Sequence, residues 1–219
     1  MVFTDRVEAG QILAGRLGSY FRQKDVIVLG IPRGGVPVAF EIAKALQAPL
    51  DVFVSRKLGV PGQEELAFGA ISTGGVRILD PEIVEASGLT DPEIEQIAEK
   101  EMKELERRER AYRGGRPPLD LERKIVILVD DGIATGSSMR AAVKALRLLH
   151  PTRIVIAVPV APLSTCRHLR PEVDDLVCAS TPEFFQAIGQ FYENFSQVTD
   201  EEVNDLLQKA IRRDTRNAV

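Results

Sequence analysis

Residues 125–138 read Ile-Val-Ile-Leu-Val-Asp-Asp-Gly-Ile-Ala-Thr-Gly-Ser-Ser and are the most informative stretch of the chain. The first five are apolar and mostly β-branched, which is typical of a strand buried on both faces of a parallel sheet. The strand ends at Asp130 and Asp131, and we expect a helix to open after Gly136 and to continue past Met139. The stretch therefore predicts a strand, a turn and a helix, with two carboxylates at the end of the strand.

The predicted turn has the composition of an anion-binding site. Gly132 and Gly136 let the backbone turn tightly, and hydroxyl groups follow at Thr135, Ser137 and Ser138. Backbone N–H groups and the helix dipole converge on one anion at such a helix start. Two adjacent carboxylates would repel a bare phosphate, so we expect them to accept hydrogen bonds from a vicinal diol, directly or through a divalent cation. Ribose has that diol, and the predicted ligand is a phosphorylated sugar.

Other interpretations of this stretch fit less well. A Walker A loop has a Lys before its final Ser or Thr, and a dinucleotide fingerprint has three glycines with an acid about twenty residues later. Residues 125–138 meet neither pattern. The remaining alternative is a plain strand-to-helix turn with an acidic N-cap, which leaves the coincidence of acids, glycines and hydroxyls unexplained.

Length and composition limit the number of domains and the kinds of partner that the chain can have. With 219 residues, 44% of them hydrophobic, the chain is long enough for one α/β domain with an insertion or an extension, whereas two full domains would be cramped. The formal net charge of −4 indicates no general affinity for nucleic acid or for an acidic membrane. We therefore expect small-molecule partners, no nucleic acid and no membrane.

Cysteine and histidine are scarce. Cys166 and Cys178 are the only cysteines, and the chain shows no apolar N-terminal segment, so we expect a cytoplasmic protein with reduced thiols. With only His150 and His168 besides them, the ligands of an ordinary zinc site are lacking. We interpret all four as packing or surface residues, and we expect any metal to be oxygen-ligated magnesium.

Strands and helices alternate along the chain. Further short apolar runs predict strands at 26–31, 50–54, 153–158 and 175–178. Helical spacing predicts helices over 5–17, from 35 to about 46, and over 163–170. This alternation predicts the α/β class, with a mainly parallel central sheet flanked by helices and right-handed crossovers.

The middle of the chain departs from this alternation. The polar stretch 58–65 contains Gly and Pro and predicts a loose loop, which is a candidate lid. A hairpin is predicted for 66–72 with 76–79, and an amphipathic helix for 91–113. Mixed charges at 103–110 indicate surface ion pairs on that helix, with a partner-binding role as the alternative.

At residues 125–138 the chain resembles the type I phosphoribosyltransferase family, whose hallmark is an apolar strand, two acids, two small or apolar residues, then Thr-Gly and small hydroxylic residues. The resemblance extends less specifically from about Val26 to Phe195. It implies one domain over 1–219 with the family's fold, including an inserted charged helical segment at about 81–118 and a C-terminal hood at about 179–219. An aliphatic residue is commoner in the family at the position of Gly132, so we expect a slightly looser loop here.

The resemblance implies binding of phosphoribosyl pyrophosphate together with Mg²⁺. Asp130 and Asp131 would be catalytic residues that contact the ribose hydroxyls and the metal. The backbone that follows them would surround the 5′-phosphate through Gly132, Ile133, Ala134, Thr135, Gly136, Ser137 and Ser138.

Displacing pyrophosphate from ribose C1 also requires positive charge or amides around the leaving group. Arg33 and Gly34 lie in a turn after a strand and would face pyrophosphate; the family's equivalent loop often carries a cis peptide, here near Pro32-Arg33-Gly34. Arg56 would bring further charge as a lid closes. Lys57 matches the basic residues that precede the family's catalytic flexible loop, so it is a candidate catalytic residue. A plain turn and ordinary surface cations remain the alternatives.

The aromatic-rich segment 181–195 distantly resembles the hood of the purine phosphoribosyltransferases. By that analogy Phe185 would stack on a planar acceptor, and Glu193 or Asn194 would approach the magnesium. Simple burial of the aromatic rings over the sheet is the alternative. No Lys stands where those enzymes read a 6-oxopurine, so the identity of the base stays open.

The expected function is a Mg²⁺-dependent transferase that moves the phosphoribosyl group to a nucleobase-like nitrogen acceptor and releases pyrophosphate. One alternative is a non-catalytic sensor or regulator that binds phosphoribosyl pyrophosphate or a nucleotide. A second alternative is an enzyme of the same fold that uses another sugar phosphate, such as a phosphorylase or a phosphohydrolase. The candidate assembly is a homodimer.

Overall fold

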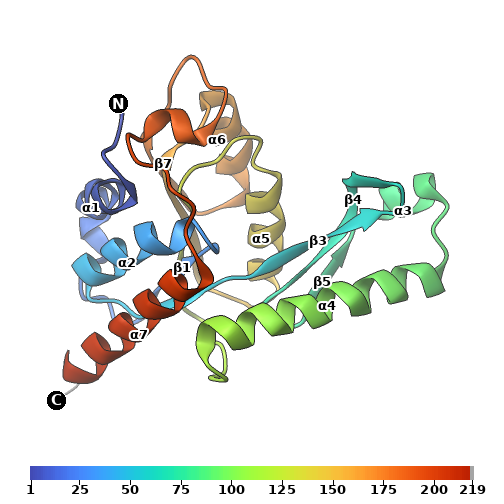
Figure 1. The fold of residues 1–219 in the computed structure, drawn as a ribbon, viewed down its shortest axis with the longest axis horizontal. Helices are drawn as coiled ribbons and strands as arrows, with labels where there is room; N and C mark the ends of the chain where they lie inside the picture. Colours follow the sequence, from blue (N-terminus) through green and yellow to red (C-terminus); the bar gives the residue numbers. More distant parts are fainter. Residues whose placement is uncertain (218–219) are drawn as a thin grey trace.

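The computed structural model describes residues 1–217 and has a central sheet with helices on both faces (Figure 1). The sheet has five strands in the order β2-β1-β6-β7-β8, and every neighbouring pair is parallel. The strands are β1 (Val26–Gly30), β2 (Leu50–Val52), β6 (Ile125–Val129), β7 (Arg153–Val160) and β8 (Asp175–Ser180). The predicted α/β fold with a parallel central sheet is confirmed.

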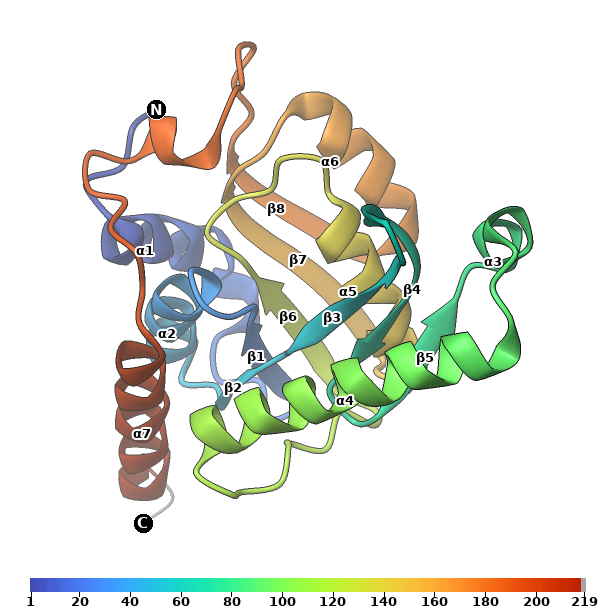
Figure 2. The ribbon, with the colours of Figure 1, turned by 45° about the vertical axis from the view of Figure 1, so that its right-hand side comes forward.

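Helices cover the two faces of the sheet in pairs. α1 (Arg6–Arg16) and α2 (Gly35–Leu46) lie on one face, while α5 (Ser137–Arg147) and α6 (Leu163–Leu169) lie on the other (Figure 2). Along β1, Val28 packs in the core beneath α1 and α2, and the next residue, Leu29, packs in the core beneath α5 and α6. A strand that is buried on both faces needs apolar residues throughout, which explains its unbroken apolar sequence.

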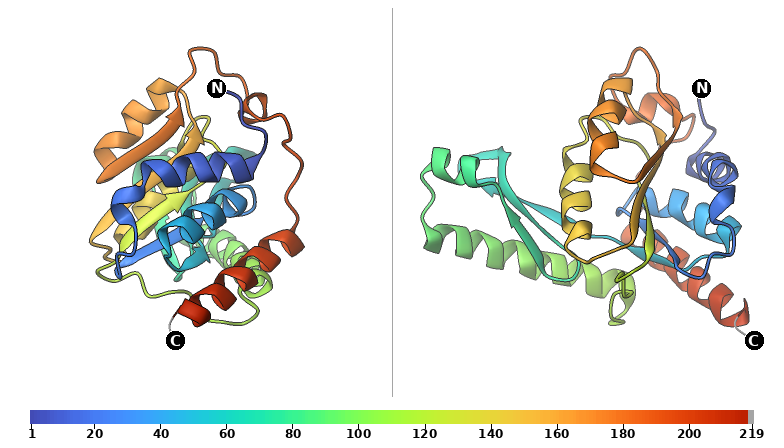
Figure 3. Two further views of the ribbon diagram at one scale, coloured as in Figure 1. Left: turned by 90° about the vertical axis from the view of Figure 1, so that its left-hand side faces the viewer. Right: turned by 180° about the vertical axis from the view of Figure 1, so that it is seen from behind.

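A second structural unit, which we call the arm (residues 55–113), projects from the side of the sheet (Figure 3). It has an antiparallel sheet of β3 (Ser55–Val60), β4 (Gln63–Ser72) and β5 (Val76–Leu79), followed by α3 (Pro81–Ser87) and α4 (Asp91–Arg113). The predicted hairpin and the predicted long helix are confirmed. Within the described residues, no helix has the length and apolar character needed to cross a membrane.

The prediction of a loose loop over residues 58–65 was wrong. β3 and β4 continue through this segment, and Val60 pairs with Gln63 across the Pro61-Gly62 turn. Gly62 adopts a φ of 76°, a conformation that glycine reaches without strain. Leu58 and Val60 are buried, so their burial stabilises a strand where the polar neighbours suggested a loop.

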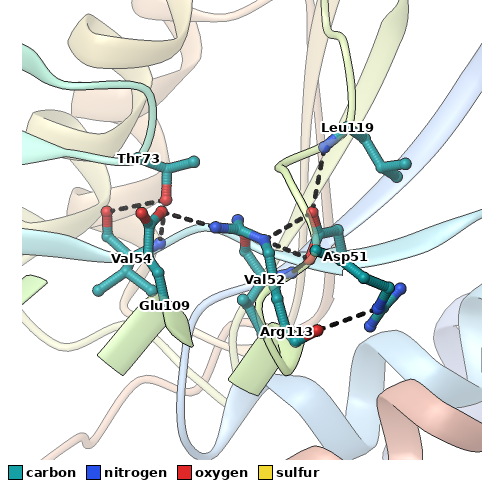
Figure 4. Close-up of polar contacts among 8 residues, drawn as sticks. Asp51, Val52, Val54, Thr73, Glu109, Arg113 and Leu119 are labelled. Atoms are coloured by element: carbon teal, nitrogen blue, oxygen red, sulfur yellow. Dashed lines mark hydrogen bonds and ion pairs between the residues drawn. The ribbon is translucent and has the colours of Figure 1, made fainter. Parts of the chain in front are cut away.

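The root of the arm is fixed to the central sheet by Arg113, the last residue of α4 (Figure 4). Its side chain is only 3% exposed, and its Nε lies 3.0 Å from each carboxylate oxygen of Asp51 in β2. Nη1 donates to Glu109 at 2.7 Å and Nη2 donates to the carbonyl of Val52 at 2.8 Å. Because a buried charge without partners is strongly unfavourable, these contacts hold the end of α4 against β2.

The C-terminal region divides into two parts. Residues 181–199, here called the hood segment, contain one short helix, η3 (Ile188–Phe191), and run along the N-terminus, where Phe3 donates its N–H to the carbonyl of Phe191 at 2.8 Å. α7 (Asp200–Asn217) then packs against α2, α4 and β2. The sequence analysis did not predict α7, and the last two residues of the predicted hood lie outside the described residues.

Candidate functional site

The acid pair, Asp130 and Asp131, follows β6 at the carboxyl edge of the sheet, where the loop after β1 lies directly against it. Ile31 donates its N–H to the carbonyl of Val129 at 2.8 Å. A Cβ atom on Gly34 would overlap the carboxylate of Asp131. A larger residue here would therefore have to displace this carboxylate. The Pro32–Arg33 peptide bond of the loop is cis.

The environment of the acid pair disfavours negative charge. Burial raises the pKa of Asp130 well above its ordinary value, and the charge of Asp131 raises it further. Burial also raises the pKa of Asp131, although Arg6 opposes this shift. The backbone N–H of Asp131 donates to Oδ1 of Asp130 at 2.8 Å. The pair is short of positive partners, which suits a bound cation or the hydroxyl donors of a sugar.

Arg6 is a site residue that the sequence analysis missed. Its Nε donates to Oδ2 of Asp131 at 2.8 Å, although the two residues are 125 positions apart. Asp5 caps the start of α1 by accepting the N–H groups of Val7 and Glu8, and this cap stabilises the first turn, which carries Arg6. No motif marks Arg6 in the sequence, because the contact depends on tertiary structure.

The 132–138 loop forms a turn that leads into α5. Gly136 has a φ of 85° and is the N-cap of α5, which begins at Ser137, so the N-cap residue supplies no side-chain cap. The N–H of Ser137 makes a long hydrogen bond of 3.5 Å to the hydroxyl of Thr135. The hydroxyls of Thr135 and Ser137 lie 3.2 Å apart and are exposed. Thr165 donates its hydroxyl to the carbonyl of Ala134 at 2.7 Å and thereby fixes the loop from α6. The arrangement leaves helix N–H groups and hydroxyls at one exposed point beside the acid pair.

Gly132, which was expected to loosen the loop slightly, is buried against side chains of other elements. A Cβ atom here would lie 2.6 Å from Cγ2 of Ile188 and 3.1 Å from Cγ1 of Val160. The side chain of Ile188, which comes from the hood segment, fills the space that an aliphatic residue at 132 would need. Gly132 therefore lets the hood segment pack closely against the end of β6.

The three predicted basic residues lie in different surroundings. Arg33 is partly exposed, and its Nη1 lies 3.9 Å from a carboxylate oxygen of Asp200 at the start of α7. Arg56 donates its Nε to Glu101 of α4 at 2.7 Å, so the arm itself holds this side chain. Lys57 is exposed on β3. The structure thus brings Arg33 to the loop beside the acid pair, while Arg56 is engaged within the arm.

The predicted hood residues Phe185 and Glu193 both contact other parts of the chain. Phe185 is partly buried and stacks on Phe191 with ring centroids 5.3 Å apart, whereas the neighbouring Phe184 is 85% exposed. Glu193 is exposed and donates its backbone N–H to the carbonyl of Phe3 at 2.8 Å. Among the described side chains, no three carboxylate, His or Cys groups gather as a metal site, so Glu193 does not complete such a set with the acid pair.

The comparison with known families agrees with this geometry. Residues 6–196 match the model of the phosphoribosyl transferase domain. The chain belongs to this family. A Mycobacterium tuberculosis H37Rv protein named "Putative phosphoribosyl transferase Rv0571c" is 47% identical to it over 211 residues, which make up 96% of this chain and 47% of that protein. The chain therefore spans about half the length of the curated relatives that it matches.

Solved structures give the same fold for this phosphoribosyl transferase domain. The protein TT1426 from Thermus thermophilus is 39% identical, has a TM-score of 0.85, and the match covers 95% of this chain and 99% of that one. A Neisseria gonorrhoeae protein, whose structure holds bound ppGpp, matches with a TM-score of 0.52 over 95% of this chain and 94% of its own. It is 15% identical, so this second likeness concerns the fold alone.

Proposed function

We propose that this protein is a phosphoribosyltransferase, which binds phosphoribosyl pyrophosphate with Mg²⁺ and transfers the phosphoribosyl group to a nitrogen of a nucleobase-like acceptor. The observation that carries the proposal is the position of the acid pair directly beside the 132–138 loop. A ribose 5-phosphate has its diol and its phosphate at opposite ends of one small ring. The acid pair would take the diol end, and the 132–138 loop would take the phosphate end.

The 5′-phosphate is assigned to the 132–138 loop. The first turn of α5 offers backbone N–H groups, and the helix dipole favours an anion there. The hydroxyls of Thr135 and Ser137, together with the exposed Ser138, supply further donors. Thr165 holds the loop in place, so little ordering is needed when the phosphate binds.

The ribose hydroxyls are assigned to the acid pair. Both aspartates accept hydrogen bonds from the diol and hold the sugar ring with C1 facing the hood segment. The donor set fits Mg²⁺, because this ion is usually held by one or two carboxylates together with phosphate oxygens of the substrate. When bound, the ion would offset the charge that develops on the leaving pyrophosphate.

The pyrophosphate is assigned to the loop after β1 and to the arm. Arg33 lies in the loop that contacts the acid pair, and its partial exposure lets it turn from Asp200 to a pyrophosphate oxygen. Lys57 on β3 is the proposed cation on the arm side and stays the candidate catalytic residue. Arg56 joins them once it exchanges Glu101 for pyrophosphate.

The acceptor is assigned to the space beneath the hood segment. Phe185 already packs on Phe191, so we assign the stacking role to the exposed ring of Phe184 instead. A planar nitrogen heterocycle placed there would face ribose C1. Its nitrogen attacks C1 as the bond to pyrophosphate breaks, and the configuration at C1 is inverted.

Release of pyrophosphate tests the proposal. Phosphoribosyl pyrophosphate, Mg²⁺ and a panel of purine and pyrimidine bases are incubated with the protein, and pyrophosphate is measured by a coupled assay. Release that depends on one base and disappears in the Asp130→Asn, Asp131→Asn double variant supports the enzyme, with Asp120→Asn, an exposed acid outside the motif, as the control. Tight binding without release for any base would instead indicate the sensor or regulator.

A further inference from the structure

We infer that Arg6 is a positioning residue of the phosphoribosyl pyrophosphate site, which orients the carboxylate of Asp131 and couples it to the hood segment. The inference rests on the proposed function, because it concerns the same ligand. Arg6 lies outside the family motif at 125–138. The arginine belongs to α1, which packs on the opposite side of the sheet from α5.

The contact with Asp131 fixes one particular oxygen. Nε of Arg6 lies 2.8 Å from Oδ2, and both side chains are only 11% exposed. The same oxygen packs against Gly34 in the loop after β1, where a Cβ atom would overlap it. Oδ2 is therefore enclosed between the guanidinium and this loop, and we assign Oδ1 to the ribose hydroxyl.

Arg6 is itself held by the hood segment. Its Nη1 donates to the carbonyl of Ser196 at 2.8 Å, and its guanidinium lies over the ring of Phe195, 4.0 Å from the ring centroid. Tyr192 donates its hydroxyl to the backbone carbonyl of Asp131 at 2.6 Å. The hood segment thus contacts both partners of the ion pair, the arginine through its side chain and the aspartate through its backbone.

These contacts connect the two substrates. The proposed acceptor binds beneath the hood segment, and the donor ribose binds to the acid pair. A shift of the hood segment changes the position of Arg6, and Arg6 changes the orientation of Asp131. We therefore expect the acceptor side and the donor side of the site to be coupled through this guanidinium.

The role of Arg6 is separable from the stability of α1. The helix is capped by Asp5, and the buried side chains of Ala9 and Leu13 pack it against the core. Removing the guanidinium leaves those contacts in place, but it also leaves the buried carboxylate of Asp131 without its ion-pair partner. We therefore expect a lower melting temperature, and the ligand affinity is measured well below it, where the variant is folded.

Three variants test this assignment. Arg6→Gln removes the charge and the forked donor, Arg6→Lys keeps the charge but loses the planar fork, and Arg16→Gln is the matched control. Arg16 lies in the same helix and also donates to another element, the carbonyl of Cys178 at 2.8 Å, but it is far from the acid pair along α1. The affinity for phosphoribosyl pyrophosphate with Mg²⁺ is measured by isothermal titration, and the melting temperature by circular dichroism.

Arg6→Gln is expected to weaken binding roughly 10- to 100-fold, because a charge-assisted hydrogen bond is lost. Arg6→Lys should recover part of that loss, and Arg16→Gln should bind as the wild type does. Unchanged affinity in Arg6→Gln, or an equal loss in both Gln variants, would overturn the positioning role. A wild type that binds no phosphoribosyl pyrophosphate would overturn the proposed function itself, and the inference with it.

Discussion

The anchor of the arm gives the most quantitative prediction. Arg113→Met keeps most of the side-chain volume but removes a guanidinium that contacts Asp51, Glu109 and the carbonyl of Val52. Asp51, 8% exposed, is left buried with only the N–H groups of Val52 at 2.8 Å and Leu119 at 3.3 Å. Removing one partner of a buried ion pair destabilises a protein by about 3–5 kcal/mol.

That loss in the free energy of unfolding corresponds to a measurable fall in the melting temperature. In a chain of this size each kcal/mol lowers the melting temperature by roughly 2–4 °C, so Arg113→Met should melt about 6–20 °C below the wild type. Thermal unfolding followed by circular dichroism at neutral pH measures it. Arg107→Met is the control, because Arg107 pairs with Glu104 on the exposed face of the same helix and its loss should leave the midpoint unchanged.

A second variant tests whether the unpaired charge of Asp51 causes the loss of stability. Asp51→Asn in the Arg113→Met background removes the unpaired charge and should recover part of the lost stability. If Arg113→Met melts at the same temperature as the wild type, the ion pair does not anchor the arm and the reasoning from burial is refuted. Equal shifts for Arg113→Met and Arg107→Met would refute it as well.

Three further predictions concern the site. Gly132→Val should destabilise the protein by about 1–3 kcal/mol through overpacking, and Ile188→Ala in the same chain should offset part of that loss in a double-mutant cycle of thermal unfolding. Asp130→Asn should raise the melting temperature at neutral pH, because burial and Asp131 raise the pKa of Asp130 in the folded protein and its ionisation there opposes folding. That gain should vanish as the pH falls below the ordinary aspartate range, where the carboxyl is protonated in both states; an equal gain at all pH values would contradict it. Thr135→Ala with Ser137→Ala should weaken phosphoribosyl pyrophosphate binding roughly 5- to 50-fold without changing the melting temperature, because both hydroxyls are exposed in the free protein.

The sequence predicted those parts of the fold that depend on local patterns. The strand at 125–129 is recognisable because every one of its residues is apolar, and the helix at 91–113 is recognisable from its charged face and from Gly114 at its end. The acids and hydroxyls that follow β6 are adjacent in the chain. Their grouping in space therefore followed directly from the sequence.

What the sequence did not show depends on contacts between distant segments. Arg6 meets Asp131 across 125 positions, and Ile188 fills the space above Gly132. The sequence around these residues has no pattern that predicts either contact. The strands at 58–65 were missed for another reason: the Pro61-Gly62 turn and the polar residues around it resemble a loop, and the burial of Leu58 and Val60 in the arm outweighs that tendency.

The central claim is that the acid pair and the 132–138 loop form one site for phosphoribosyl pyrophosphate. Isothermal titration of the protein with this compound, with and without Mg²⁺, tests it most directly. The account predicts Mg²⁺-dependent binding that is lost in the Asp130→Asn, Asp131→Asn double variant and retained in Asp120→Asn. Absence of binding under both conditions, or equal binding by the double variant, would contradict it.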